Sequence, residues 1–241
     1  MTRRARRGMD TRNLSRARPA LTAPVFDRKF AAFLFDMDGT ILNSIAAAER
    51  IWGAWAARHG LDVATFLPTI HGVKGVETIS RLGLPGVDAQ KEAQDILDAE
   101  MAELEGIVPI PGAAEFLASL PRGRWALVTS AGLDLALKRL KEAGITRPDV
   151  IVSGDDVKHG KPNPECFLLG ARLLGVSAGD CLVFEDATAG ILAGEGAGAA
   201  IMVITQTHHH PMETSLATIA DYQNVRALTQ EDGSLTLHHA H

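Results

Sequence analysis

Short apolar runs alternate with amphipathic segments along the second half of the chain. The runs predict buried strands at residues 125–128, 150–152, 181–184 and 200–204. Between them, apolar residues recur at helical spacing and predict helices at 113–120, 133–143, 164–174 and 187–197. An earlier apolar run, Ala31–Phe35, predicts one more buried strand. Strands that alternate with helices are typical of an α/β fold with a doubly wound parallel sheet.

A block of about sixty residues after the first strand breaks this rhythm. Between Ile45 and Val108 the pattern is helical, and it predicts helices at 45–60, 76–82 and 88–104. Ser44 is placed to cap the first of them. We therefore predict an all-helical domain over residues 45–108, inserted into a core domain of residues 30–44 and 109–241. Within the core, residues 225–228 and 235–237 flank Asp-Gly and predict a β-hairpin.

Charge is distributed unevenly along the 241 residues. The net charge is −5, but residues 1–29 carry nine Lys and Arg against two Asp and Glu, so the remainder has a net charge of −12. A targeting peptide or a nucleic-acid-binding tail would explain the basic arm, but we favour a disordered extension without catalytic consequence. The acidic body argues against a nucleic-acid partner. No apolar run is long enough for a membrane span.

The cysteine content bears on the compartment. Cys166 and Cys181 form no closely spaced motif, which favours buried thiols in a reducing compartment, the cytoplasm, over a disulfide framework. We expect the protein to be a monomer.

Two carboxylates follow the first strand at once. Asp36 and Asp38 project to the same side of an extended segment, so they repel each other unless a cation lies between them or one takes a proton. Gly39 allows a sharp turn after them. The ordinary alternative is a surface Asx turn before a helix, because Asp-Gly is a common turn dipeptide.

Polar side chains also follow the other predicted strands. Thr129 and Ser130 end one strand, Glu185 and Asp186 end another, and Lys161 follows a third in a Gly-Lys-Pro turn. The carboxyl ends of parallel strands meet at one edge of the sheet, where ligands bind. Clustered carboxylates suit Mg²⁺, and a lysine with a hydroxyl beside it suits a phosphoryl group. No Walker loop is present, so a nucleotide cradle is not indicated.

Taken together, these motifs resemble the haloacid dehalogenase-like hydrolase superfamily, in its phosphatase branch with a helical cap. The resemblance covers about residues 30–225 and is carried by residues 36–40, 129–130, 160–162 and 185–191. Less specific stretches, among them Ile70-His71-Gly72, are similar to bacterial hexitol and sugar phosphatases, glycerol-phosphatases and 2-deoxyglucose-6-phosphatases. The resemblance implies a Rossmann-like core with an inserted helical cap.

The same resemblance implies roles for individual residues. Asp36 is expected to be the nucleophile that forms an aspartyl-phosphate, and Asp38 the general acid and base. Thr129 and the backbone N–H of Ser130 would hold phosphoryl oxygens, and Lys161 would balance negative charge. The expected ligands of Mg²⁺ are Asp36, the backbone carbonyl of Asp38, Asp186 and, directly or through water, Glu185.

The expected substrate is a small phosphorylated sugar or polyol, such as a hexitol, hexose or glycerol phosphate. The cap loop 70–75 is a candidate contact surface, in which His71, Gly72 and Lys74 would approach its hydroxyls, although His71 can equally well tie the loop to its own cap.

Two other functions are open. One is a β-phosphoglucomutase-like mutase, which Ala131 and Gly132 disfavour because they offer no side chain to grip a second phosphate. The other is a binding protein that has kept the fold without the chemistry.

Two further sets of residues receive ordinary interpretations. The run His208–His210 resembles a metal cluster, but neighbouring loop residues seldom share one ion. Glu77, Asp95 and Glu103 are expected on the solvated face of the cap helices.

Overall fold

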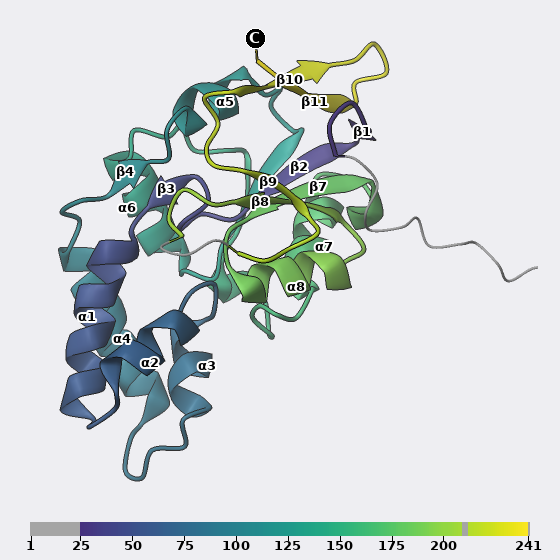
Figure 1. Ribbon diagram of the computed structural model, residues 1–241. Helices are drawn as coiled ribbons and strands as arrows, with labels where there is room; N and C mark the ends of the chain where they lie inside the picture. Colours follow the sequence, from purple (N-terminus) through teal and green to yellow (C-terminus); the bar gives the residue numbers. More distant parts are fainter. Residues whose placement is uncertain (1–24, 209–211, 241) are drawn as a thin grey trace, which may run out of the picture.

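A computed structural model describes residues 25–208 and 212–240. Within them, strands form a parallel sheet with the order β6-β5-β2-β7-β8-β9, which confirms the predicted doubly wound α/β fold (Figure 1). The strands of this sheet are β2 Ala32–Phe35, β5 Trp125–Val128, β6 Val150–Val152, β7 Cys181–Glu185, β8 Ala200–Ile204 and β9 Ala217–Ile219.

Strand β2 lies inside the sheet and pairs in parallel with β5 on one side and β7 on the other. All four of its residues are buried, and successive side chains point to opposite faces. Phe33 and Phe35 belong to one hydrophobic cluster, whereas Ala32 and Leu34 belong to a second. A strand buried on both faces has no place for a charge until it ends, which fixes where the polar residues begin.

Helices cover both faces of the sheet, as the alternating pattern predicts. The helices of the core are α5 Ala113–Ser119, α6 Leu133–Glu142, α7 Glu165–Leu173 and α8 Thr188–Gly196, with short 3₁₀ turns at Gly154–Asp156 and Ala178–Asp180. Phe116 of α5 and Leu140 of α6 join the cluster of Phe33. Phe167 of α7 and Ile191 of α8 join the other.

The inserted segment forms a helical cap with a hydrophobic cluster of its own. Its helices are α1 Ile45–Arg58, α2 Val63–Phe66, α3 Gly75–Ser80 and α4 Ala89–Ala102, with a 3₁₀ turn at Leu67–Thr69. Trp52 and Trp55 are buried at the centre of this cluster together with Phe66 and Ile96. Short strands β3 Leu42–Asn43 and β4 Val108–Pro109 pair antiparallel at the base of the cap, so the chain enters and leaves it side by side.

A second, antiparallel sheet lies at the opposite end of the core from the cap (Figure 1). It has the order β1-β11-β10, with β1 Lys29–Phe30, β10 Val225–Thr229 and β11 Leu235–His239. Strands β10 and β11 confirm the predicted hairpin. Of the basic arm expected over residues 1–29, residues 1–24 lie outside the described part of the chain. Residues 25–29 differ from the expectation, because Val25 is buried and the Asp27 N–H donates to the Leu237 carbonyl.

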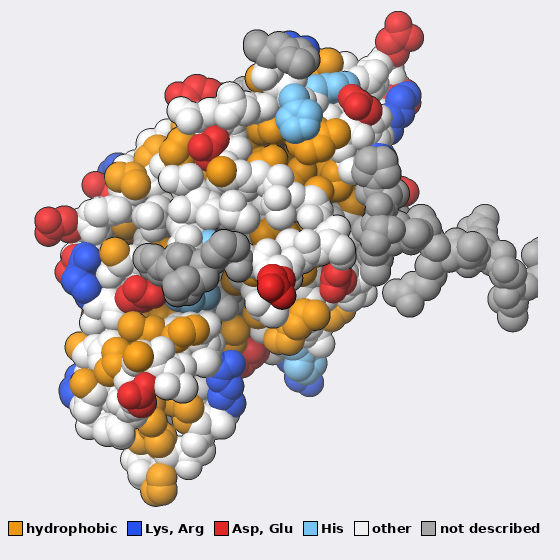
Figure 2. Space-filling model, in the orientation of Figure 1, with side chains coloured by type: hydrophobic (Ala, Val, Ile, Leu, Met, Phe, Trp, Pro, Cys, Tyr) orange, Lys and Arg blue, Asp and Glu red, His pale blue; other side chains and the backbone are white. Residues whose placement is uncertain are grey.

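The described helices include none long and apolar enough to cross a membrane. On the face shown in Figure 2, Lys and Arg side chains are interspersed with Asp and Glu.

Candidate active site

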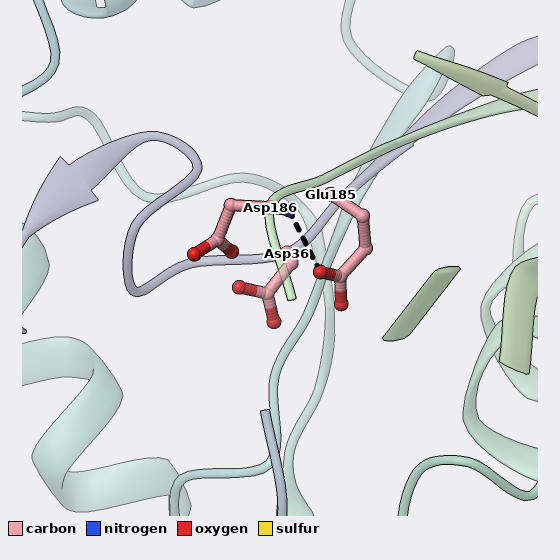
Figure 3. Close-up of side chains that lie close together, drawn as sticks. All are labelled: Asp36, Glu185 and Asp186. Carbon is pink, nitrogen blue, oxygen red and sulfur yellow. Dashed lines mark hydrogen bonds between the residues drawn. The ribbon is translucent and has the colours of Figure 1, made fainter. Parts of the chain in front are cut away.

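Three acidic side chains and one lysine are buried together at the carboxyl edge of the parallel sheet. Asp36 follows β2 directly, Glu185 ends β7, and Asp186 comes next in the chain. These carboxylates point toward one another (Figure 3). Asp36 is 4% exposed, so the alternative of a surface Asx turn is wrong. The strand ends therefore converge as their sequence order predicts.

Lys161 is the cation that enters this cluster. Its Nζ lies 2.5 Å from Asp36 Oδ1 and 2.7 Å from Glu185 Oε1, and it donates to the Val128 carbonyl at 3.2 Å. Three acceptors match the three donors of an ammonium group. Burial lowers the pKa of Lys161, but the carboxylates of Asp36 and Glu185 outweigh it and hold the pKa above its ordinary value. Lys161 therefore stays charged.

One ammonium group is not enough for three carboxylates. Burial raises the pKa of Asp36 to about 8, although Lys161 opposes the shift. Burial also raises the pKa of Asp186, and the neighbouring charges of Glu185 and Asp36 raise it further. Oxygen atoms of these three residues lie within 4.8 Å of one another. A hard divalent cation fits this donor set, because it is held by oxygen ligands and would supply the missing positive charge.

The three carboxylates differ in how many of their oxygens already accept hydrogen bonds. Glu185 Oε1 accepts from Lys161, and its Oε2 accepts the backbone N–H groups of Asp186 and Ala187 at 2.8 and 2.9 Å. Asp186 accepts a hydrogen bond from Thr40 Oγ1 at Oδ1, 3.0 Å away. Asp36 and Asp186 therefore have more free coordination capacity than Glu185, whose carboxylate mainly fixes Lys161 and the turn after β7.

Gly39 makes room for Asp186. Its φ is +87°, and a Cβ at this position would overlap the Asp186 carboxylate. The close approach brings the turn after β2 against the turn after β7. A glycine is therefore required here for both its backbone conformation and its size.

The side chain of Asp38 has its hydrogen-bond partners outside this cluster. Its Oδ1 accepts hydrogen bonds from Ser44 Oγ at 2.5 Å and from Arg139 Nη1 at 3.0 Å. Ser44 occupies the N-cap position of α1, but its side chain does not cap the helix as expected, because its hydroxyl binds Asp38. Asn43 Oδ1 instead accepts the N–H of Ile45. Arg139 and this use of Ser44 were not predicted.

Thr129 and Ser130 follow β5 and lie at the floor of a cavity of about 280 Å³ between core and cap. Thr129 Oγ1 accepts the Ala131 N–H at 3.1 Å. Ser130 Oγ donates to the Gly72 carbonyl at 2.8 Å, so this hydroxyl joins the core to the cap loop. Asp36 and Asp38 line the same cavity.

The cap residues expected to contact substrate also line the cavity. His71 Nε2 lies 3.4 Å from Glu49 Oε1 within the cap, which keeps both interpretations of His71 open. Lys74 Nζ donates to the Val157 carbonyl of the core at 3.0 Å. Glu77 is not on a solvated face, because its Oε1 accepts the Gly160 N–H at 2.8 Å, beside Lys161.

His208 also reaches the acidic cluster. Its Nε2 lies 2.9 Å from the Asp186 carbonyl, which can only accept, so this nitrogen carries the proton. His209 and His210 lie outside the described residues.

Comparison with known proteins finds relatives that are named as hydrolases or phosphatases. The family model for haloacid dehalogenase-like hydrolases matches residues 30–198. Hexitol phosphatase A of Escherichia coli is 41% identical over 176 residues, which are 71% of this chain and 82% of the relative. Glycerol-1-phosphate phosphohydrolase 2 of Saccharomyces cerevisiae is 35% identical over 200 residues, covering 78% and 79% of the two chains. A hydrolase structure from Pseudomonas syringae has a TM-score of 0.71 and 26% identity, and the alignment covers 80% of this chain and 94% of that one.

Proposed function

The chain belongs to the haloacid dehalogenase-like hydrolase family, and on that premise we propose that it is a metal-dependent phosphatase of small sugar or polyol phosphates. Its relatives named as hexitol and glycerol-1-phosphate phosphatases support this substrate class. The cavity of about 280 Å³ lies near the lower end of the range for ligand pockets, which suits a compact substrate.

Asp36 acts as the nucleophile in the proposed first step. A carboxylate oxygen of Asp36 attacks phosphorus, the bond from phosphorus to the ester oxygen breaks, and an aspartyl-phosphate forms. Lys161, 2.5 Å from Asp36 Oδ1, favours the ionised form of this carboxylate and then offsets charge on the phosphoryl oxygens. A bound divalent cation would screen the repulsion between the anionic nucleophile and the anionic substrate. We propose that this cation is Mg²⁺ and that its ligands are Asp36, Asp186, the Asp38 carbonyl and, directly or through water, Glu185.

Asp38 handles the proton in both halves of the proposed reaction. It protonates the departing ester oxygen, so that an alcohol rather than an alkoxide leaves. It then takes a proton from the water molecule that attacks the aspartyl-phosphate and releases inorganic phosphate. The Thr129 hydroxyl and the Ser130 backbone N–H hold phosphoryl oxygens at the cavity floor. His71, Gly72 and Lys74 contact the alcohol portion from above.

One observation carries this proposal: the buried Asp36 is held by Lys161 beside Asp186. It also lines a cavity that Asp38 lines as well. The test measures phosphate release from a panel of hexitol, hexose and glycerol phosphates with Mg²⁺ and with EDTA. We expect Mg²⁺-dependent turnover, and a loss of at least about 1,000-fold in Asp36→Asn, because the amide is no nucleophile. Turnover near wild type in a folded Asp36→Asn would refute the assignment.

The mutase alternative is less favoured. Ala131 and Gly132 line the cavity beside Thr129 without a polar side chain for a second phosphate. In the panel, a mutase would convert a sugar monophosphate into an isomer, whereas the proposed phosphatase releases inorganic phosphate.

We also propose a reducing compartment, the cytoplasm. Cys166 and Cys181 are both buried free thiols. A monomeric state remains a prediction.

A further inference from the structure

Arg139 is a charged residue on the buried face of a core helix. It lies on α6 among the buried Leu135, Ala136 and Leu140 and is only 4% exposed. An arginine in such a position requires partners for its charge. It has two: Asp38 Oδ1 lies 3.0 Å from Nη1, and Glu100 Oε1 lies 3.3 Å from Nη2. Glu100 belongs to α4, the last helix of the cap.

The hydrogen bonds distinguish the two oxygens of Asp38. Ser44 Oγ and Arg139 Nη1 both reach Oδ1. An arginine only donates, so Oδ1 is an acceptor in this arrangement and does not carry a proton toward the substrate. Among the described residues, no hydrogen bond reaches Oδ2. Because Asp38 lines the cavity, Oδ2 is the oxygen available to the ester oxygen of a bound substrate.

We propose that Arg139 is a positioning residue that couples docking of the cap to the orientation of Asp38. This rests on the proposed phosphatase function. With Oδ1 held by Arg139, Oδ2 delivers its proton to the ester oxygen as the bond from that oxygen to phosphorus breaks and the bond from Asp36 to phosphorus forms. The alcohol leaves neutral, and Asp38 is left ionised beside Arg139.

Residues at both ends of the cap segment contribute to this arrangement. Ser44 immediately precedes α1, and Glu100 lies two residues before the end of α4. Glu100 orients the guanidinium from the cap side, because a planar guanidinium that bridges two carboxylates has little freedom to rotate. When the cap moves away, Arg139 loses Glu100 and Asp38 loses a fixed partner. The general acid is then in position only over a closed site.

The test uses substrates that differ in how much the leaving group needs a proton. We would measure kcat/KM, which reports steps up to departure of the alcohol, for p-nitrophenyl, phenyl and glycerol phosphates. In Arg139→Met we expect kcat/KM to fall by about tenfold for phenyl and glycerol phosphates and by less than about twofold for p-nitrophenyl phosphate, because a positioned acid contributes at least about 100-fold for poor leaving groups. Asp38→Asn should show the same selectivity with a larger loss.

Glu100→Gln tests the cap side of the proposal. It should show the same order of substrates with a smaller loss, and combining it with Arg139→Met should add little, because both act on one oxygen. Arg139→Lys should restore part of the loss for phenyl phosphate. If Arg139→Met does not fold, the double variant Arg139→Met, Glu100→Met removes both charges together and is measured instead.

Lys138 provides the matched control. It precedes Arg139 on α6, and its Nζ donates to the Met101 carbonyl beside the end of α4, 2.5 Å away, without contacting Asp38. Lys138→Met should change all three values of kcat/KM by less than about twofold.

Three results would overturn the proposal, each with an active wild-type enzyme. An equal fall for all three substrates would make Arg139 merely structural. A fall for glycerol phosphate alone would make it a substrate contact. A rise for phenyl phosphate would mean that it holds Asp38 out of position. An inactive wild-type enzyme would instead refute the proposed phosphatase function.

Discussion

At the scale of single residues, the acidic cluster links stability to pH and to metal. The folded state raises the pKa of Asp36 from 3.8 to about 8, and that of Asp186 upward as well, chiefly through burial. Between these two values the folded protein keeps a proton that the unfolded chain has lost. Unfolding then releases a proton, so the free energy of unfolding falls as the pH rises through this range.

We therefore expect the metal-free protein to unfold at a lower temperature at about pH 8 than at about pH 5, by several degrees. Added Mg²⁺ should raise the midpoint more at the higher pH, because it binds the ionised carboxylates without displacing protons. Thermal unfolding of EDTA-treated protein with and without Mg²⁺ measures both effects. Asp36→Asn should weaken them, whereas Asp95→Asn, on the exposed surface of α4, should not. Equal Mg²⁺ effects at the two pH values would contradict this account.

The residues of the acidic cluster could be predicted because their signal is local. Asp36, Thr129 and Glu185 each interrupt or follow an apolar run, and parallel strands place such ends at one edge. Arg139 and Glu100 were missed because their pairing joins segments 39 residues apart. A signal exists all the same: Arg139 falls on the helical face defined by Leu135, Ala136 and Leu140, where a charge is costly unless it is paired.

At the scale of elements, helix α3 of the cap holds the loop that carries Lys161. Glu77 Oε1 accepts the Gly160 N–H at 2.8 Å, and Lys74 Nζ donates to the Val157 carbonyl at 3.0 Å. Both contacts join cap and core within a few residues of the lysine that binds Asp36. Closure of the cap is therefore expected to steady Lys161 as well as to cover the cavity.

Glu77→Ala should lower kcat/KM by about tenfold, because a hydrogen bond to a charged acceptor is worth about 1.5 kcal/mol. Glu77→Gln keeps an oxygen acceptor and should stay within about threefold of wild type. Asp95→Ala serves as the control from an exposed cap surface. Steady-state kinetics on p-nitrophenyl phosphate and on a polyol phosphate measure the effect. An unchanged Glu77→Ala enzyme would show that Lys161 is held without help from the cap.

Elements were predictable when they were long enough to have a period. The apolar runs of β5 and β8 and the amphipathic patterns of α1 and α4 extend over several residues, and the structure places strands and helices there. Strands β1, β3 and β4 have two residues each, and α2 has four. Such short segments carry no periodicity, and pairing with distant parts of the chain creates them. The pairing of β3 with β4 at the base of the cap therefore could not be predicted from the sequence.

At the scale of the whole molecule, the described fold already includes residue 25. Val25 is buried and Phe30 lies in the hydrophobic core, so the body begins before the predicted boundary at residue 29. Deleting residues 1–24 should leave kcat/KM and the unfolding temperature unchanged within error, because the composition of the arm is that of a solvated extension.

Deleting residues 1–30 is the contrasting variant. It removes two buried apolar side chains and the pairing of β1 with β11, so the free energy of unfolding should fall by at least about 3 kcal/mol. Thermal and urea unfolding of both truncated proteins measure the difference. A large loss of stability in the shorter deletion would show that the arm packs on the body.

Pairing of β1 with β11 also determines where the chain could be circularly permuted. Lys29 faces Thr236 in the antiparallel register, and the ring of Phe26 stacks on that of His239 at 3.9 Å. The first and last described segments thus lie side by side at the end of the core that is remote from the cap (Figure 1). In a variant trimmed to residues 25–240, a short linker could join these two residues, and new ends could be opened in an exposed loop such as 122–123. Tension applied to the chain at residues 25 and 240 would therefore load this strand pair before the acidic cluster.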